Sequence, residues 1–180
     1  DLSTGRLENV PEEVDFIAGD VADRSVLAQL PPHVSGLLHL AGQSSGEISF
    51  DDPVGDLHRN LVTTLRLIEW AAENSSPRLV LASSMSVYGQ QPDPLQVPEV
   101  SVPRPLSCYG VGKLAAEHYL QVYREQVPSV ALRMFNTYGP GQDLDNLRQG
   151  MVSIFVAQAV RDRRILVKGS LDRFRDLVHI

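Results

Sequence analysis

A tyrosine and a lysine stand four residues apart in the stretch SCYGVGKLAAEHYL, residues 107–120. Side chains at this spacing share one face of an α-helix, about one turn apart. A tyrosine is a poor base at pH 7 because its reference pKa is about 10, and a neighbouring ammonium lowers that pKa by stabilising the phenolate. Tyr109 and Lys113 are therefore suited to abstracting a proton, although a pair on an exposed helix face would have the same spacing.

A serine upstream of this helix adds a third group. The apolar run RLVLASS, residues 78–84, is typical of a buried strand, and Ser84 is its last residue. In doubly wound sheets, ligands bind at the carboxyl ends of the strands. A hydroxyl at this strand end, just upstream of the tyrosine helix, can therefore reach the same reacting oxygen as Tyr109.

Short apolar runs alternate with helical patterns along the whole chain, which predicts parallel βαβ units and a doubly wound α/β sheet. Strands are expected at 14–20, 36–42, 78–84, 129–136, 164–169 and 174–180. Helices are expected at 23–30 with Asp23 as N-cap, at 52–74, from about 107, and at 151–161. Four strand ends then carry small or polar residues, as a binding crevice requires: Asp20, Ala41 to Gly42, Ser83 to Ser84, and Asn136.

The composition narrows the class of protein. A length of 180 residues with 43% hydrophobic and 21% charged residues is ordinary for a globular domain. The net charge of −6 and the lack of a basic patch argue against a nucleic-acid partner. The single cysteine, Cys108, excludes an internal disulfide and favours a reducing compartment. With no membrane-length apolar stretch, no signal peptide and no metal-ligand spacing, we expect a cytoplasmic protein without a metal.

Several further segments follow the chain in a recognisable order. They are AGDVAD (18–23), LLHLAGQ (37–43), RNLVTTLRLIE (59–69), LASSMSVYG (81–89), LRMFNTYGPGQ (132–142) and RFRDLVHI (173–180). Together with the tyrosine–lysine pair, they resemble the extended short-chain dehydrogenase/reductases, an NAD-dependent epimerase/dehydratase family with a Rossmann-like NAD(P)-binding fold. The closest resemblance is to nucleotide-sugar epimerases of the UDP-glucose 4-epimerase type. Thr63 stands where that family usually has a glycine.

The resemblance implies a role for each matching residue. The catalytic set would be Ser84, Tyr109 and Lys113. NAD would lie against Asp20, Val21, Leu40, Ala41, Gly42, Asn60, Ala82, Ser83, Tyr109, Lys113 and Phe135. The substrate, a UDP-sugar or similar nucleotide sugar, would meet Ser84, Ser86, Tyr109, Asn136 and Arg175. Plainer interpretations stay open for single residues: a turn role for Asp20, a solvated helix face for Asn60, a surface pair for Arg175 and Asp176, and a core position for His39.

The implied reaction is epimerisation at C4 through a transient 4-keto sugar. Tyr109 would take the proton of the 4-hydroxyl, directly or through Ser84, while a hydride passes from C4 to NAD and later returns to the other face. A 4,6-dehydratase of the same family is the alternative, but its acid pair after the catalytic hydroxyl is replaced here by Met85 and Ser86. A non-catalytic binding or assembly protein on the same scaffold is the alternative of another class.

The chain resembles only the middle of such an enzyme. It contains no G-x-G-x-x-G turn to hold a pyrophosphate, and DLSTGRLENV resembles the stretch just after the family's second strand. We therefore expect a fragment without the first βα unit and most of the C-terminal substrate lobe. Residues 1–140 would belong to the NAD-binding domain, and residues 141–180 would begin the substrate-binding lobe and add a returning strand. The helices near Pro53 and Ser107 form a dimer interface in the resembling family, so a homodimer is expected.

Overall fold

The computed structural model describes residues 1–74, 77–92, 96–172 and 174–180. The strands are β1 (Gly36–His39), β2 (Arg78–Ser84), β3 (Ser129–Met134), β4 (Asn136–Tyr138) and β5 (Leu177–His179). The α-helices are α1 (Arg24–Leu27), α2 (Pro53–Leu57), α3 (Thr63–Glu73), α4 (Cys108–Val122) and α5 (Met151–Asp162). Within this described part of the chain, no helix is both long and apolar enough to cross a membrane.

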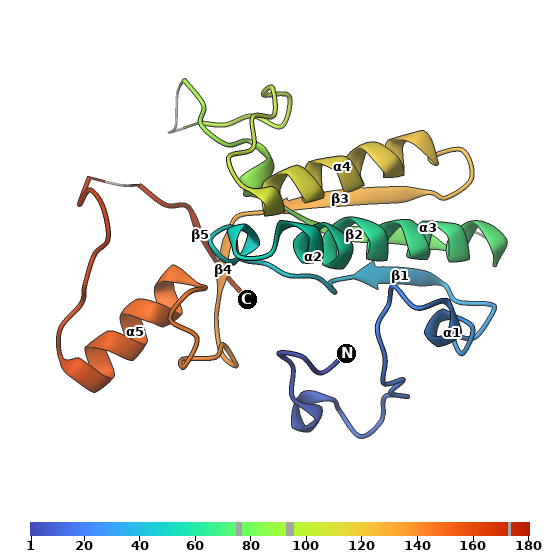
Figure 1. Ribbon diagram of the computed structural model, residues 1–180, viewed down its shortest axis with the longest axis horizontal. Helices are drawn as coiled ribbons and strands as arrows, with labels where there is room; N and C mark the ends of the chain where they lie inside the picture. The colour runs from blue at the N-terminus through green and yellow to red at the C-terminus, as the bar shows by residue number, and fades with distance from the viewer. Residues whose placement is uncertain (75–76, 93–95, 173) are drawn as a thin grey trace.

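The principal sheet is parallel, with the strand order β1-β2-β3 (Figure 1). Leu38 pairs with Val80, and Val80 in turn pairs with Val130, so the three strands run in register. A separate parallel pair, β4 and β5, continues from the end of β3 towards α5. The prediction of an α/β fold built on a parallel sheet is confirmed.

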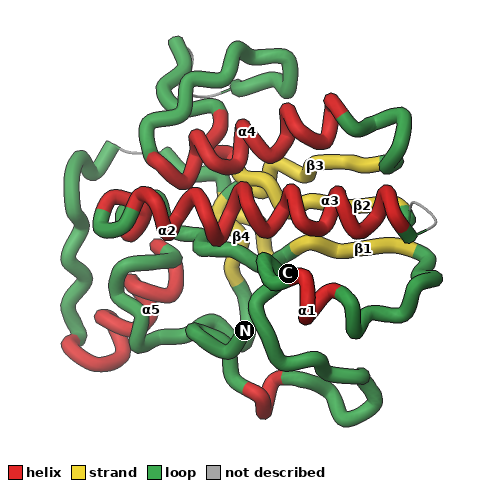
Figure 2. The backbone as a smooth tube through the Cα atoms, turned by 45° about the vertical axis from the view of Figure 1, so that its right-hand side comes forward, coloured by secondary structure: helices red, strands yellow, loops and turns green. Residues whose placement is uncertain are grey.

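Helices α3 and α4 cover one face of this sheet (Figure 2). The core between them is apolar and fully closed around Ile68, Leu79, Leu81 and Ala116, each 0% exposed. The alternation of side chains along a strand sends the intervening residues to the opposite face. There Leu38 is 74% exposed and Leu132 is 50% exposed, so the described residues leave that face largely open. The two faces of the sheet therefore differ sharply in how they are covered.

Four of the predicted strands need correction, and a fifth, 36–42, ends early at His39. Residues 14–20 form no strand, because no described strand offers residues 15–19 a backbone hydrogen-bond partner. Residues 164–169 also form no strand: they are exposed, and the Leu166 amide donates to the side chain of Gln158 at 2.8 Å instead. The expected strand 129–136 divides at Phe135, after which the chain leaves the principal sheet and pairs with β5. Within 174–180, only Leu177–His179 are strand.

The predicted helices are confirmed with changes at their ends and in one interior. Asp23 caps α1 by accepting a hydrogen bond from the Ser25 amide at 2.8 Å, although this helix ends early, at Leu27. The expected helix 52–74 runs from Pro53 to Glu73, but its residues His58–Val62 are wound as a π-helix. Such one-turn π segments are frequent near functional sites. This segment places Asn60 in the interior.

His39, at the end of β1, is a buried core histidine, as the plainer interpretation held. It is 2% exposed, and its Nε2 lies 3.0 Å from the Thr64 hydroxyl. Burial, with a smaller contribution from the charge of Lys113, lowers the pKa of His39 to about 4. The folded chain therefore binds the proton more weakly than the unfolded chain does.

This pKa makes stability depend on pH in a defined direction. Between pH 6.5 and 4 the unfolded state takes up the His39 proton first, so the free energy of unfolding falls as the pH falls, by about 2–3 kcal/mol from this group. His39→Gln should remove that part of the pH dependence, as measured by urea unfolding at pH 7 and pH 4.5. His58→Gln, at an exposed position, is the matched control. Equal pH dependence in the wild type and His39→Gln would contradict the assignment.

Candidate active site

A pocket of about 460 Å³ opens beyond the carboxyl end of β2. Six residues predicted for the site line it: Ser83, Ser84, Ser86, Tyr109, Phe135 and Asn136. The pocket therefore lies at the end of β2, one of the strand ends at which the sequence predicts a ligand site. Asn136 reaches it as the first residue of β4 rather than as a strand end, and its Nδ2 donates to the Asp176 carbonyl at 2.7 Å.

The turn after β2 fixes the position of Ser84. Its Oγ accepts a hydrogen bond from the Ser86 amide at 3.1 Å and lies 3.1 Å from the Ser86 hydroxyl. Helix α4 begins beside this turn, with Ser107 as N-cap accepting from the Gly110 amide at 3.1 Å. A Cβ on Gly110 would lie 2.7 Å from the Ser86 carbonyl oxygen, so only glycine allows this close approach. The first turn of α4 thereby brings Tyr109 to Ser84.

Tyr109 and Lys113 are both buried, at 7% and 4% exposure. The Lys113 Nζ lies 5.7 Å from the centre of the Tyr109 ring, so the pair is not merely part of an exposed helix face. Burial raises the pKa of Tyr109; a hydrogen bond with Ser84 opposes that effect, and the charge of Asp56 adds to it. Burial also lowers the pKa of Lys113 to about 8, with Asp56 opposing. The sequence predicts that Lys113 lowers the pKa of Tyr109. In this structure the pKa of Tyr109 is raised instead.

Asn60 lies in a buried polar cluster rather than on a solvated helix face. Its side chain is 0% exposed, and its Nδ2 donates to the Asp56 Oδ1 at 3.1 Å. Its Oδ1 has no hydrogen-bond partner among the described residues. Gly42, with φ +146°, approaches so closely that a Cβ there would lie 2.6 Å from this oxygen. The structure thus joins two residues predicted for the cofactor, at a point just outside the pocket lining.

The remaining predicted residues are not among those that line the pocket. Asp20 is exposed and accepts a hydrogen bond from the Ala22 amide at 2.8 Å, which is the turn role. Arg175 is exposed, and its Nη1 donates to the Phe174 carbonyl at 2.9 Å. The other four residues lie in or near the principal sheet. Val21 is half-buried against the core, Leu40 and Ala41 are exposed after β1, and Ala82 is half-buried within β2.

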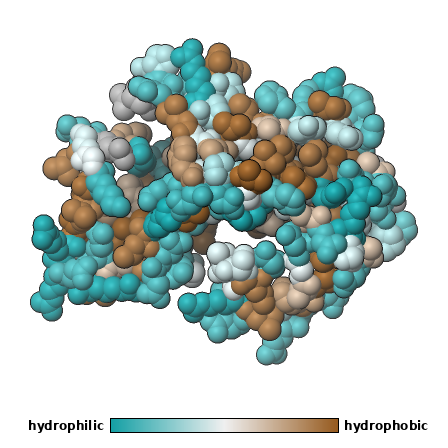
Figure 3. All heavy atoms as spheres, in the orientation of Figure 1, coloured by the Kyte–Doolittle hydropathy of each residue, from teal (hydrophilic) through white to brown (hydrophobic). Residues whose placement is uncertain are grey.

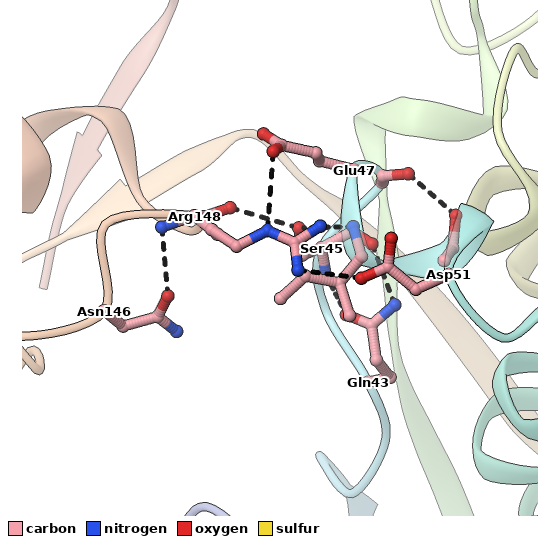
Figure 4. Close-up of polar contacts among 9 residues, drawn as sticks. Gln43, Ser45, Glu47, Asp51, Asn146 and Arg148 are labelled. Carbon is pink, nitrogen blue, oxygen red and sulfur yellow. Dashed lines mark hydrogen bonds and ion pairs between the residues drawn. The ribbon is translucent and has the colours of Figure 1, made fainter.

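A wall of the pocket that sequence reasoning missed comes from the segment between β4 and α5. Its polar lining residues are Gln142, Asp143, Asn146 and Gln149, followed by Ser153 of α5. Arg148 ties this segment to the loop after β1: its guanidinium contacts Asp51 at 2.7 Å and Glu47 at 3.4 Å, and its carbonyl accepts from Ser45 at 3.2 Å (Figure 4). These partners lie about 100 residues apart in sequence, so no local spacing pattern could reveal them.

A partly buried ion pair behind the pocket was also missed. Arg133 of β3 binds Glu117 of α4 at 2.7 Å, and the Ser83 hydroxyl donates to the same carboxylate. The Arg133 guanidinium also lies 4.8 Å from the centre of the Tyr88 ring. The contact with Glu117 raises the pKa of Arg133. The pair joins α4, the end of β2 and β3, and so holds Ser83 and Ser84 against the helix that carries Tyr109.

In the described part of the chain, no group of three or more potential metal-ligating side chains gathers.

The comparison with protein families is decisive for the class of protein. Residues 1–180 match the model of the NAD dependent epimerase/dehydratase family. The chain belongs to this family.

Individual members of the epimerase/dehydratase family match along the chain. The UDP-glucose 4-epimerase of Mycolicibacterium smegmatis is 35% identical over 192 residues, which cover 100% of this chain and 60% of the relative. The crystal structure of the Thermus thermophilus UDP-glucose 4-epimerase complex with NAD has a TM-score of 0.87 at 34% identity, covering 99% of this chain and 60% of that one.

A second solved structure is even closer in backbone. The UDP-glucose 4-epimerase of Thermotoga maritima, solved with UDP-glucose, has a TM-score of 0.91 at 28% identity and covers 99% of this chain and 59% of its own. The chain therefore spans about 60% of the length of the epimerases that it matches. The Rossmann-like fold predicted by resemblance is confirmed.

The ion pair between Arg133 and Glu117 should contribute to the free energy of unfolding. Glu117→Gln should lower the free energy of unfolding by about 1–2 kcal/mol, because it leaves the partly buried Arg133 charge without its ionic partner. Glu69→Gln is the matched control: Glu69 pairs with Arg24 and Arg66 at the surface, so the change should stay below about 1 kcal/mol. Urea unfolding measures both, and equal losses would contradict the prediction.

Proposed function

We propose that this chain is part of an NAD-dependent epimerase that inverts C4 of a nucleotide sugar through a transient 4-keto intermediate. The single observation that carries the proposal is the buried Tyr109, which adjoins Lys113 and Ser84 at the rim of a polar pocket. The family match supports the reaction class, and the UDP-glucose 4-epimerase relatives support a UDP-sugar as substrate. Because those relatives are longer, the activity is proposed for the longer protein.

The residues present fit NAD as the cofactor. Asn60 offers a buried amide oxygen without a partner among the described residues, and Gly42 leaves the neighbouring backbone free of a side chain. We expect Tyr109, Lys113, Ser83 and Phe135 to hold the nicotinamide end, and the exposed backbone of residues 40–42 to line the rest. When bound, NAD supplies a group that accepts and returns a hydride.

The side chains of the chain itself would manage the proton. Tyr109 would take the proton of the sugar 4-hydroxyl and later give it back, since the same group must serve both directions. The Ser84 hydroxyl, which hydrogen-bonds to Tyr109, would orient the reacting oxygen. Lys113 would supply the nearby positive charge that favours the phenolate. Ser86, Asn136 and Arg175 are proposed to contact the substrate.

A 4,6-dehydratase is disfavoured by the lining of the pocket. Met85 and Ser86 follow Ser84 there, and neither carries a carboxylic acid able to protonate a leaving hydroxyl. A non-catalytic scaffold protein is disfavoured by the buried Tyr109 and Lys113, since placing a lysine at 4% exposure has a desolvation cost that a structural role does not require.

We further propose a homodimer, a cytoplasmic location, and a division of the chain into a cofactor-binding part, 1–140, and the start of a substrate lobe, 141–180. Exposed apolar side chains support the dimer: Val54 on α2 is 77% exposed, and Val111 and Val122 on α4 are 55% and 74% exposed. On the side seen in Figure 3, apolar residues gather where α3 and α4 lie. In the proposed homodimer, α2 and α4 of one protomer would bury these apolar side chains against α2 and α4 of its partner.

NAD binding tests the proposal directly. The 180-residue chain should bind NAD weakly or not at all in a calorimetric titration, because it contains no Gly-rich turn to hold the pyrophosphate. A form extended upstream to the length of the relatives should bind it. If the extended form also fails to bind NAD, the enzyme proposal is wrong.

Tyr109→Phe tests the proposed proton transfer in the extended protein. The kcat for UDP-glucose epimerisation should fall by about 10²–10⁴-fold, the range expected when a general acid–base group is removed, while NAD stays bound. Tyr119→Phe, at a 40% exposed position on the same helix, is the matched control and should keep its turnover. Turnover retained in Tyr109→Phe would exclude this role for Tyr109.

A further inference from the structure

A buried carboxylate lies beside the proposed catalytic helix and has no part in the chemistry derived so far. Asp56, on α2, is 1% exposed, which is rare for an aspartate. Its Oδ1 accepts two hydrogen bonds, from Gln43 Nε2 at 2.7 Å and from Asn60 Nδ2 at 3.1 Å. Its Oδ2 has no hydrogen-bond partner among the described residues. One half of this carboxylate is therefore fully bonded and the other half is not.

The unbonded oxygen faces the start of α4. A Cβ built on Gly112 would lie 3.8 Å from Asp56 Oδ2 and 3.6 Å from the Asn60 Cβ, so α2 and the π segment pack directly against this turn of α4. The next residue, Lys113, is 4% exposed and interacts with Asp56 through its charge. The two charges thus lie on facing helices in a region closed to water.

The charged and titratable groups around the two residues define their electrostatic setting. Asp56 is influenced by Lys113 from α4 and by Arg59 from the π segment. Lys113 is influenced by Asp56, and its own charge acts on His39 at the end of β1. Tyr109 lies beside Lys113 on the same helix. Burial raises the pKa of Asp56, and its amide donors and both cations oppose this by favouring the ionised form.

We propose that Asp56 is a positioning residue, whose buried carboxylate, packed against the start of α4, keeps the neighbouring Lys113 charged beside Tyr109. A lysine removed from water loses its proton readily unless an opposite charge is near. The hydrogen bonds at Oδ1 fix the carboxylate through Gln43 and Asn60, so that Oδ2 keeps its direction towards α4. The inference rests on the proposed function only for the role of the lysine charge beside Tyr109; the electrostatic interaction of Asp56 with Lys113 can be tested on this chain without cofactor or substrate.

Direct titration of Lys113 tests the pairing without cofactor or substrate. The sequence contains two lysines, Lys113 and the exposed Lys168, so the chain labelled with ¹³C-lysine gives two ε-carbon signals, which Lys168→Arg assigns. In the wild type, the Lys113 signal should titrate with a pKa of about 8. In Asp56→Asn, which keeps the shape and an acceptor oxygen for Gln43, the midpoint should fall by about one pH unit.

Two further variants separate charge from packing. Asp52→Asn changes an exposed acid that caps the same helix and contacts Arg59 at 3.3 Å, so the Lys113 midpoint should stay where it is. Asp56→Glu restores the charge and should return the midpoint towards the wild-type value. The same midpoint in Asp56→Asn and in the wild type would overturn the proposal.

If Asp56→Asn does not fold, the double variant Asp56→Asn with Lys113→Met decides the question. Recovery of folding supports the charge pairing, because the lysine charge left without a partner has also been removed. Failure to recover assigns Asp56 to packing and overturns the proposal. The outcomes are independent of the proposed function: an unchanged lysine titration would leave the epimerase proposal standing, whereas loss of NAD binding by the extended protein would not affect the pairing.

Discussion

The contact between the first turn of α4 and the turn after β2 determines the geometry of the candidate site. It depends on Gly110, because any side chain there would collide with the Ser86 carbonyl. It also depends on two serine hydroxyls: Ser107 caps the helix, and Ser84 caps the turn that faces it. With these parts in contact, Tyr109 and Ser84 meet at the pocket, and Lys113 follows one helical turn deeper. The ion pair between Glu117 and Arg133 secures the same contact from behind.

Burial acts in opposite directions on the two groups of the pair. It raises the pKa of Tyr109 and lowers that of Lys113, so each group is driven towards its neutral form. The chain by itself therefore disfavours the charged pair, a phenolate beside an ammonium. Because opposite charges favour each other's ionised forms, a further positive charge near Tyr109 would favour the phenolate. The carboxylate of Asp56 favours the charged form of Lys113, but the same negative charge raises the pKa of Tyr109.

Much of this architecture could be predicted from sequence because it depends on local patterns. The apolar run of β2, the N-cap Asp23, the start of a helix near Ser107, and the spacing of Tyr109 and Lys113 are readable within a few residues. Residues 14–20 show the limit: an apolar run becomes a strand only beside a partner strand. The burial of Asp56 and the contacts of Arg148 were equally out of reach, because both depend on elements that are distant in sequence. The π segment that turns Asn60 inwards leaves no periodic signal either.

The open face of the principal sheet has a thermodynamic consequence. Leu38, Leu132 and Met134 stay 74%, 50% and 41% exposed in the folded chain, so on unfolding they gain less contact with water than buried core residues do. The heat-capacity change of unfolding follows the newly exposed apolar area, so it should lie below the ordinary value of about 12–15 cal/mol/K per residue. A smaller heat-capacity change flattens the curve of stability against temperature. The difference between the two faces of the sheet would thus affect how steeply the free energy of unfolding of this chain changes with temperature.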